Sequence, residues 1–92
     1  MSVTRINEFQ AQPDKADELR EFLLSVVASM SSLPGCQSSH LLQSHDSPTR
    51  FVVIEVWDSV ESHQASVQNI PPESFAQVME LLDGRPRGEY FH

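Results

Sequence analysis

The sequence predicts a single α+β domain, residues 1–92, in which a four-stranded sheet carries helices on one face. Two observations favour this class. A β-branched and aromatic run, residues 51–57, changes directly into a helix start. Strand-like segments also lie at residues 3–9 and 88–92, so strands flank the helices at both ends of the chain.

Chain length, net charge and cysteine count limit the kinds of partner and cellular setting that we expect, before any motif is considered. A chain of 92 residues buries only about 60–65% of its unfolded surface, so self-association would add useful burial. A formal net charge of −7 and the lack of any Lys/Arg run argue against nucleic acid as a partner. One cysteine, no signal-peptide-like N-terminus and no apolar run of membrane-spanning length favour a soluble, reducing, cytoplasmic setting without membrane contact.

The central run at residues 51–57 has two largely apolar faces. One face carries Phe51, Val53, Glu55 and Trp57, and the other carries Val52, Ile54 and Val56. A half-solvated antiparallel strand alternates apolar with polar residues, so we expect both faces of this strand to be covered. Asp58 is expected to cap the helix that follows, with Glu61 favoured by the helix dipole.

The elements before the central run follow from hydrophobic spacing and from glycine and proline. Residues 3–9 alternate as a strand that places the polar Asn7 among apolar neighbours. One helix then runs from Pro13-Asp14 to the Leu33-Pro34-Gly35 stop. Its apolar stripe consists of Ala16, Leu19, Leu23, Val26, Val27 and Met30.

The other elements complete a recurring topology. A more polar strand at residues 36–43 suits a sheet edge or a pocket wall. Helical residues 59–68 follow the central strand, and Pro71-Pro72 separates them from a second helical piece that Gly84 is expected to cap. The order strand, helix, strand, strand, helix, strand is the split βαβ pattern of a ferredoxin-like sandwich with its helices on one sheet face.

A ferredoxin-like sandwich leaves one face of its sheet without helices. We expect the helices to meet Ile6, Val52, Ile54 and Val56. The open face would then carry the apolar residues Val3, Phe9, Phe51, Val53 and Trp57. Such a patch is larger than soluble monomers usually expose. A homodimer, a small aromatic or hydrophobic ligand, or both should cover it.

Three segments give the chain a family resemblance. They are residues 5–9 (RINEF), 33–36 (LPGC) and 51–63 (FVVIEVWDSVESH). On these segments, and over nearly its whole length, the chain resembles the antibiotic biosynthesis monooxygenase family of the dimeric α+β barrel superfamily. The resemblance implies a barrel closed by the sheets of two subunits, with a pocket between each sheet and its helices or in the barrel mouth.

Family members similar to this chain oxidise aromatic polyketides such as anthrones to quinones with O2, without flavin, metal or haem. The resemblance therefore implies a cofactor-independent monooxygenase acting on a small aromatic or quinol-type substrate. It places family pocket residues at Asn7 and Trp57. Asn7 would donate a hydrogen bond to a phenolate, and Trp57 would form an aromatic wall of a pocket that excludes water.

Six further residues complete the candidate site. His63 is a candidate catalytic base, although a hydrogen-bonded structural histidine is commoner at such a position. Glu55 is expected to be either a proton acceptor in the pocket or, more readily, half of an interchain ion pair with Arg5 or Arg50. The candidate substrate-binding residues are Phe9, His40, Phe51, Val53 and Glu55.

Two alternatives to the oxygenase stay open at this point. Haem-cleaving relatives share the two pocket positions but use a histidine on the second helical region as the iron ligand, and residues 66–82 contain none. The other alternative is a non-catalytic dimer that binds a hydrophobic metabolite or has a vestigial pocket. The four histidines lack metal-ligand spacing and the three glycines form no phosphate-binding loop, so no metal or nucleotide cofactor is expected.

Overall fold

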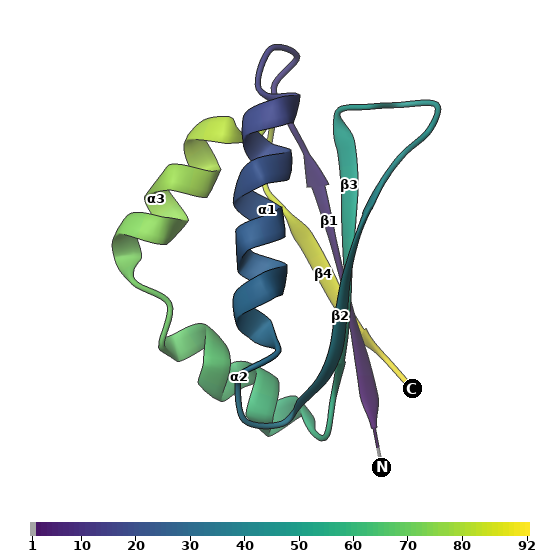
Figure 1. Ribbon diagram of the computed structural model, residues 1–92, viewed down its shortest axis with the longest axis vertical. Coiled ribbons are helices and arrows are strands. Elements are labelled where there is room, and N and C mark those ends of the chain that lie inside the picture. Colours follow the sequence, from purple (N-terminus) through teal and green to yellow (C-terminus); the bar gives the residue numbers. More distant parts are fainter. Residues whose placement is uncertain (1) are drawn as a thin grey trace.

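The computed structural model describes residues 2–92 and has the element order β-α-β-β-α-α-β (Figure 1). Its strands are β1 (Val3–Gln10), β2 (Cys36–Gln43), β3 (Arg50–Trp57) and β4 (Arg87–Phe91). Its helices are α1 (Ala16–Met30), α2 (Val60–Gln68) and α3 (Pro72–Leu81). The strands pair antiparallel in the order β2-β3-β1-β4. The predicted ferredoxin-like α+β class is therefore confirmed, with the second helical region divided into α2 and α3.

The glycine turn between α1 and β2 packs against the start of α2. Gly35 has a φ of 86°, a conformation that L side chains rarely adopt. A Cβ at this position would lie 2.6 Å from the Ser62 side chain and 2.7 Å from a carboxylate oxygen of Asp58. Only glycine therefore lets the turn before β2 pack this closely on the start of α2.

Two helix ends differ from expectation. The predicted cap at Asp58 is wrong, because Ser59 has the extended backbone of an N-cap and its Oγ accepts a hydrogen bond from the Ser62 amide at 3.1 Å. Gly84 was expected to cap the last helix, but α3 ends at Leu81 and Gly84 lies in the turn beyond it, with a φ of 95°. Serine competes well with aspartate for an N-cap position, so side-chain chemistry alone did not separate Asp58 from its neighbour.

All three helices lie on one side of the sheet, as Figure 1 shows. The face of β3 that they cover carries Phe51, Val53, Glu55 and Trp57, each with at most 2% of its surface exposed. The core cluster consists of Ala11, Leu19, Leu23, Phe51, Val53, Leu81 and Leu82. It joins the end of β1, the buried stripe of α1, the middle of β3 and the end of α3.

The outer face of the sheet, which no helix covers, is the face that we expected the helices to meet. It carries the apolar residues Ile6, Leu42, Val52, Ile54, Val56 and Phe91. The predicted assignment of the two faces is therefore wrong. Both faces of β3 are rich in Val, Ile or Phe, so alternation could not decide which one the helices cover. Among residues 2–92, no helix combines the length and apolar character needed to cross a lipid bilayer.

Candidate functional site

A carboxylate is buried between the sheet and α2. Glu55 has 2% of its surface exposed, and each of its oxygens accepts one hydrogen bond. The Trp57 indole Nε1 donates to Oε1 at 2.8 Å, and the Asn7 amide Nδ2 donates to Oε2 at 2.8 Å. Burying a carboxylate is costly unless donors compensate it, and here β1 and β3 supply those donors.

The single buried residue of α2 faces this carboxylate. His63 Nε2 lies 3.8 Å from Glu55 Oε1, and His63 Nδ1 lies 2.6 Å from the Tyr90 hydroxyl of β4. The imidazole also makes edge-on contacts with two aromatic rings, at centroid distances of 5.4 Å to Trp57 and 5.3 Å to Tyr90. Packing and hydrogen bonding together hold the ring between β3 and β4.

Arg5 closes this set of contacts on the β1 side. Its Nε donates to Asn7 Oδ1 at 3.1 Å, and its guanidinium carbon lies 4.6 Å from the centroid of the Tyr90 ring. A Cβ at Gly88 would overlap the Arg5 guanidinium, so the glycine makes room for it. We call Arg5, Asn7, Glu55, Trp57, His63 and Tyr90 the Glu55 cluster.

The surroundings of the Glu55 cluster shift the pKa values of Glu55 and His63 toward each other. Burial raises the pKa of Glu55, against the opposing effects of the Trp57 hydrogen bond, the Arg5 charge and the Asn7 hydrogen bond. Burial and the Arg5 charge lower the pKa of His63, which favours a neutral imidazole. A proton can therefore pass between the carboxyl and the imidazole at a smaller free-energy difference than between the same groups in water.

The sequence and the fold were compared with known proteins. The sequence profile described as antibiotic biosynthesis monooxygenase matches residues 2–81. The chain belongs to this family. None of the curated proteins matches the chain.

Solved structures share the fold of this family member. Rv0793 from Mycobacterium tuberculosis is 25% identical, with a TM-score of 0.86 over 100% of this chain and 94% of its own. A candidate antibiotic biosynthesis monooxygenase from Nitrosomonas europaea is 21% identical, with a TM-score of 0.90 over 98% and 88%. A variant of SnoaB, a cofactor-independent oxygenase from Streptomyces nogalater, is 19% identical, with a TM-score of 0.83 over 99% and 91%.

In this monooxygenase-family chain, the structure brings together four of the residues singled out from the sequence. Asn7, Glu55, Trp57 and His63 all belong to the Glu55 cluster. Glu55 is 2% exposed and faces the helices of its own chain, a position that does not favour the interchain ion pair expected with Arg5 or Arg50. The catalytic or binding roles of the four residues stay predictions.

The other candidate residues lie elsewhere. Phe51 and Val53 belong to the core cluster, and Phe9 is half-buried against it. His40 is exposed on the outer face, opposite Ile54 of β3. Val53 pairs with Asn7 and shares the covered face of β3 with Glu55, whereas His40 lies on the opposite face of the sheet. The substrate-binding roles of these residues stay predictions.

Two members of the cluster were not predicted as site residues. Arg5 was considered only as an ion-pair partner, and Tyr90 was part of the expected C-terminal strand. Position along β1 would have placed Arg5 on the same face as Asn7, which is the one available signal. Nothing in the sequence pattern links Tyr90 to His63, because their contact depends on how β4 pairs with β1.

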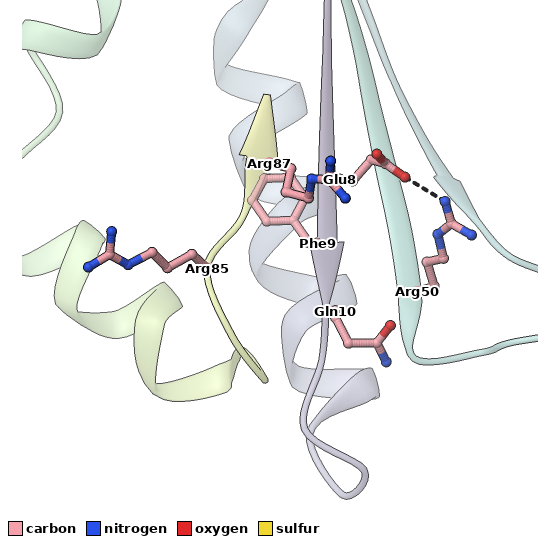
Figure 2. Close-up of a pocket in the computed structure, with 6 residues that line it drawn as sticks. All are labelled: Glu8, Phe9, Gln10, Arg50, Arg85 and Arg87. Atoms are coloured by element: carbon pink, nitrogen blue, oxygen red, sulfur yellow. Dashed lines mark hydrogen bonds and ion pairs between the residues drawn. The ribbon is translucent and has the colours of Figure 1, made fainter. Parts of the chain in front are cut away.

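A shallow hollow of about 300 Å³ lies away from the Glu55 cluster (Figure 2). It is lined by Glu8, Phe9, Gln10, Arg50, Arg85 and Arg87. In Figure 2, Glu8 lies between Arg87 and Arg50 and is paired with Arg50, while the Arg85 side chain extends away from the others. The pKa of Glu8 is lowered by its hydrogen bond to Arg50 and by the Arg50 charge. The hollow thus contains an acidic group that already balances part of its positive charge.

Proposed function

We propose that this protein is a cofactor-independent monooxygenase that oxidises a phenolic or anthrone-type aromatic substrate with O2. The observation that supports this most strongly is the buried pair of Glu55 and His63, 3.8 Å apart, with Asn7 and Trp57 holding the carboxylate. A substrate that reacts directly with O2 must first lose a proton, and this pair is a proton acceptor in a site shielded from water. Family membership supports the same reaction class.

The chemistry balances without an added cofactor. A base removes a proton from a ring CH2 group or phenol, and the carbanion passes one electron to O2. The two radicals combine to a peroxide at carbon, which then loses water and leaves a carbonyl. In total a CH2 group and O2 give a C=O group and H2O, so the substrate supplies all four electrons.

Each member of the cluster has a role in this proposal. The Glu55 and His63 pair accepts the substrate proton. The Asn7 amide has two N–H groups and uses one on Glu55, which leaves the second to stabilise a phenolate oxygen. Trp57 has no exposed surface, so it serves to hold Glu55 and to support the His63 ring rather than to form an open pocket wall.

The substrate reaches the pair when α2 moves away from the sheet. His63 is the one buried residue of α2, so few contacts oppose this movement. Apolar side chains near the end of α2 and along α3 are exposed, namely Val67, Ile70, Phe75 and Met79, at 37–46%. They offer apolar contact area for an aromatic ligand.

A second copy of the chain covers the outer face in this proposal. Leu42 and Phe91 are 53% and 43% exposed at the two edges of the apolar outer face. A homodimer formed through this face leaves the Glu55 cluster of each subunit under its own helices. The additional apolar surface that such a small chain needs to bury would then be the outer face of the sheet, and the Glu55 cluster would take no part in the interface.

The haem-degrading alternative requires a histidine nitrogen able to bind iron. His63 Nδ1 is 2.6 Å from the Tyr90 hydroxyl, Nε2 faces Glu55, and 8% of the residue is exposed. At this position His63 does not fit the role of an iron ligand, and α3 contains no histidine. No step of the proposed reaction passes through haem.

Oxygen uptake by the purified protein tests the proposal, with anthrones and hydroquinones as substrates. We expect Glu55→Gln to lower the rate by about 10²-fold or more, because an amide cannot accept the proton. Glu21→Gln is the matched control, since Glu21 is exposed on α1, away from both the Glu55 cluster and the outer face, and it should retain the wild-type rate. Uptake unchanged in Glu55→Gln would refute the role of the pair. If an anthrone or hydroquinone binds saturably but no oxygen is consumed, the result would instead support the non-catalytic ligand-binding alternative.

A further inference from the structure

The two nitrogens of His63 contact groups with different hydrogen-bonding abilities. An ionised Glu55 can only accept, whereas the Tyr90 hydroxyl can either donate or accept. A neutral imidazole carries one proton, so one nitrogen donates and the other accepts. With Glu55 ionised, the proton belongs on Nε2, which faces the carboxylate, and Nδ1 accepts from the Tyr90 hydroxyl at 2.6 Å.

Protonation of Glu55 reverses both roles. A protonated carboxyl donates to a bare Nε2, the imidazole proton then belongs on Nδ1, and Nδ1 donates to the Tyr90 oxygen. The hydroxyl of Tyr90 serves both tautomers by rotating its proton, so neither form leaves a ring nitrogen without a partner. The tautomer of His63 is thereby coupled to the protonation state of Glu55.

We propose that Glu55, His63 and Tyr90 form a proton path through which the buried carboxyl exchanges its proton with water at the edge strand β4 and is left ionised, ready to act as the base. This inference rests on the proposed function. Starting from protonated Glu55 with the imidazole proton on Nδ1, the carboxyl passes its proton to Nε2, Nδ1 releases its own proton to the Tyr90 oxygen, and Tyr90 passes its hydroxyl proton to water. One proton leaves the site, no electron moves, and Glu55 is left ionised with a protonated Nε2 facing it. The reverse sequence returns a proton from water to Glu55. Tyr90 is a positioning and relay residue, since it does not touch the reacting carbon.

The geometry requires one small movement. The separation of 3.8 Å between Nε2 and Oε1 must shorten by about 1 Å to reach hydrogen-bond distance. The Tyr90 contact is already at hydrogen-bond distance. This shortening moves α2 toward the sheet, the reverse of the displacement that admits the substrate, because His63 belongs to that helix.

The charged and titratable groups around His63 favour a neutral ring. Arg5 of β1 lies over the Tyr90 ring, and its charge disfavours an imidazolium. Among residues 2–92, Glu55 of β3 is the one acid within 4.0 Å of a ring nitrogen of His63. Cys36 of β2 is a thiol whose pKa is raised by burial and by the charge of Glu55. A ring that exchanges tautomers conducts a proton without accumulating positive charge in this buried site.

Nitrogen NMR of protein labelled in its histidines tests the path, because bare and protonated ring nitrogens have different chemical shifts. In the wild type we expect protonated Nε2 and bare Nδ1 at high pH, and exchange of the two as Glu55 titrates. Tyr90→Phe keeps the ring that Arg5 contacts but removes the hydroxyl, so the exchange should be lost. Ser66→Ala is the control, since Ser66 donates only to the His63 carbonyl, and it should behave as the wild type.

The outcomes separate the path from the proposed function. Exchange that persists in Tyr90→Phe, or a wild-type Nδ1 that stays protonated at high pH, would overturn the path. The wild-type titration decides this even if Tyr90→Phe fails to fold. In oxygen uptake, Tyr90→Phe should lower kcat about tenfold at unchanged KM, less than loss of the base itself. If the wild type shows no oxygen uptake, the proposed function fails while the NMR result still stands for the path.

Discussion

The two faces of β3 have similar apolar residues but different surroundings. The covered face, with Phe51, Val53, Glu55 and Trp57, is buried under the helices, whereas Val52, Ile54 and Val56 are half-buried on the outer face. The covered face contains a buried carboxylate, Glu55, whose neighbours on β1 and α2 compensate its charge, whereas the charged residue of the outer face, Arg50, is exposed. A buried carboxylate with hydrogen-bond donors beside it therefore distinguishes the covered face from the outer face better than apolar content does.

The covered face is itself divided into two halves. Phe51 and Val53 pack with the α1 stripe in the core cluster, while Glu55 and Trp57 meet α2 and its histidine. α1 buries Leu19 and Leu23, and α2 buries only His63. The apolar half gives the fold its stability, and the polar half lies beneath the helix that is held less firmly.

The largest expected effect comes from a charge placed on each face in turn. Val53→Asp puts an unpaired carboxylate into the core, which should cost several kcal/mol out of a total stability of about 5–15 kcal/mol and prevent folding. Ile54→Asp should leave a folded monomer, because its side chain lies on the outer face. Circular dichroism and light scattering of the two variants check this. A folded Val53→Asp protein would contradict the burial of this position in the core. An unchanged dimer mass for Ile54→Asp would contradict the proposed dimer through the outer face.

A smaller effect is expected within the cluster. Asn7→Ala removes the donor to Glu55 Oε2 and should reduce the free energy of unfolding by about 1–3 kcal/mol. Gln64→Ala, at an exposed position of α2, is the control and should change it by about 0.5 kcal/mol or less. Urea unfolding measures both values. Equal stability of the two variants would mean that the cluster does not stabilise the folded chain through this hydrogen bond.

The smallest expected effect is a pH dependence. The pKa of His63 is lowered in the folded protein from its ordinary value of 6.5, so its contribution to stability is full above that pH and is lost as the pH falls through it. Glu55 acts in the opposite sense, since its raised pKa gives a contribution that is full below 4.5 and is lost as the pH rises through the folded value. The stability difference between wild type and His63→Gln isolates the histidine and should shrink as the pH falls below 6.5. A difference that stays constant with pH would show that His63 is not buried in its neutral form.

Much of the fold was accessible from the sequence, because each element carries its own local signal. The order of elements, the Gly35 turn and the antiparallel class all follow from periodicity and from glycine and proline. The sequence pattern did not predict which face of the sheet the helices cover. The apolar stripe of α1 packs on the face that also carries the carboxylate of Glu55, and that carboxylate makes this face look less suited to burial. Burial of Glu55 becomes acceptable only when Asn7 and Trp57 are placed beside it.

The candidate site was predicted in part. Asn7, Glu55, Trp57 and His63 were singled out by resemblance and by local pattern, and they meet in one cluster. Tyr90 is 27 positions from His63 in the sequence, and their contact arises only when β4 joins the edge of β1. Such a pair has no local signal, so only the tertiary structure shows it.

Labelled dioxygen gives the most direct test of the central claim, that the covered face of β3 holds a proton acceptor for a reaction between substrate and O2. The purified protein is supplied with an anthrone and isotopically labelled O2, with a chelator and without flavin. We expect one labelled oxygen atom in the new carbonyl for each O2 consumed, and loss of this product in Glu55→Gln. Product that carries no label, or a labelled product formed as fast by Glu55→Gln as by the wild type, would contradict the claim.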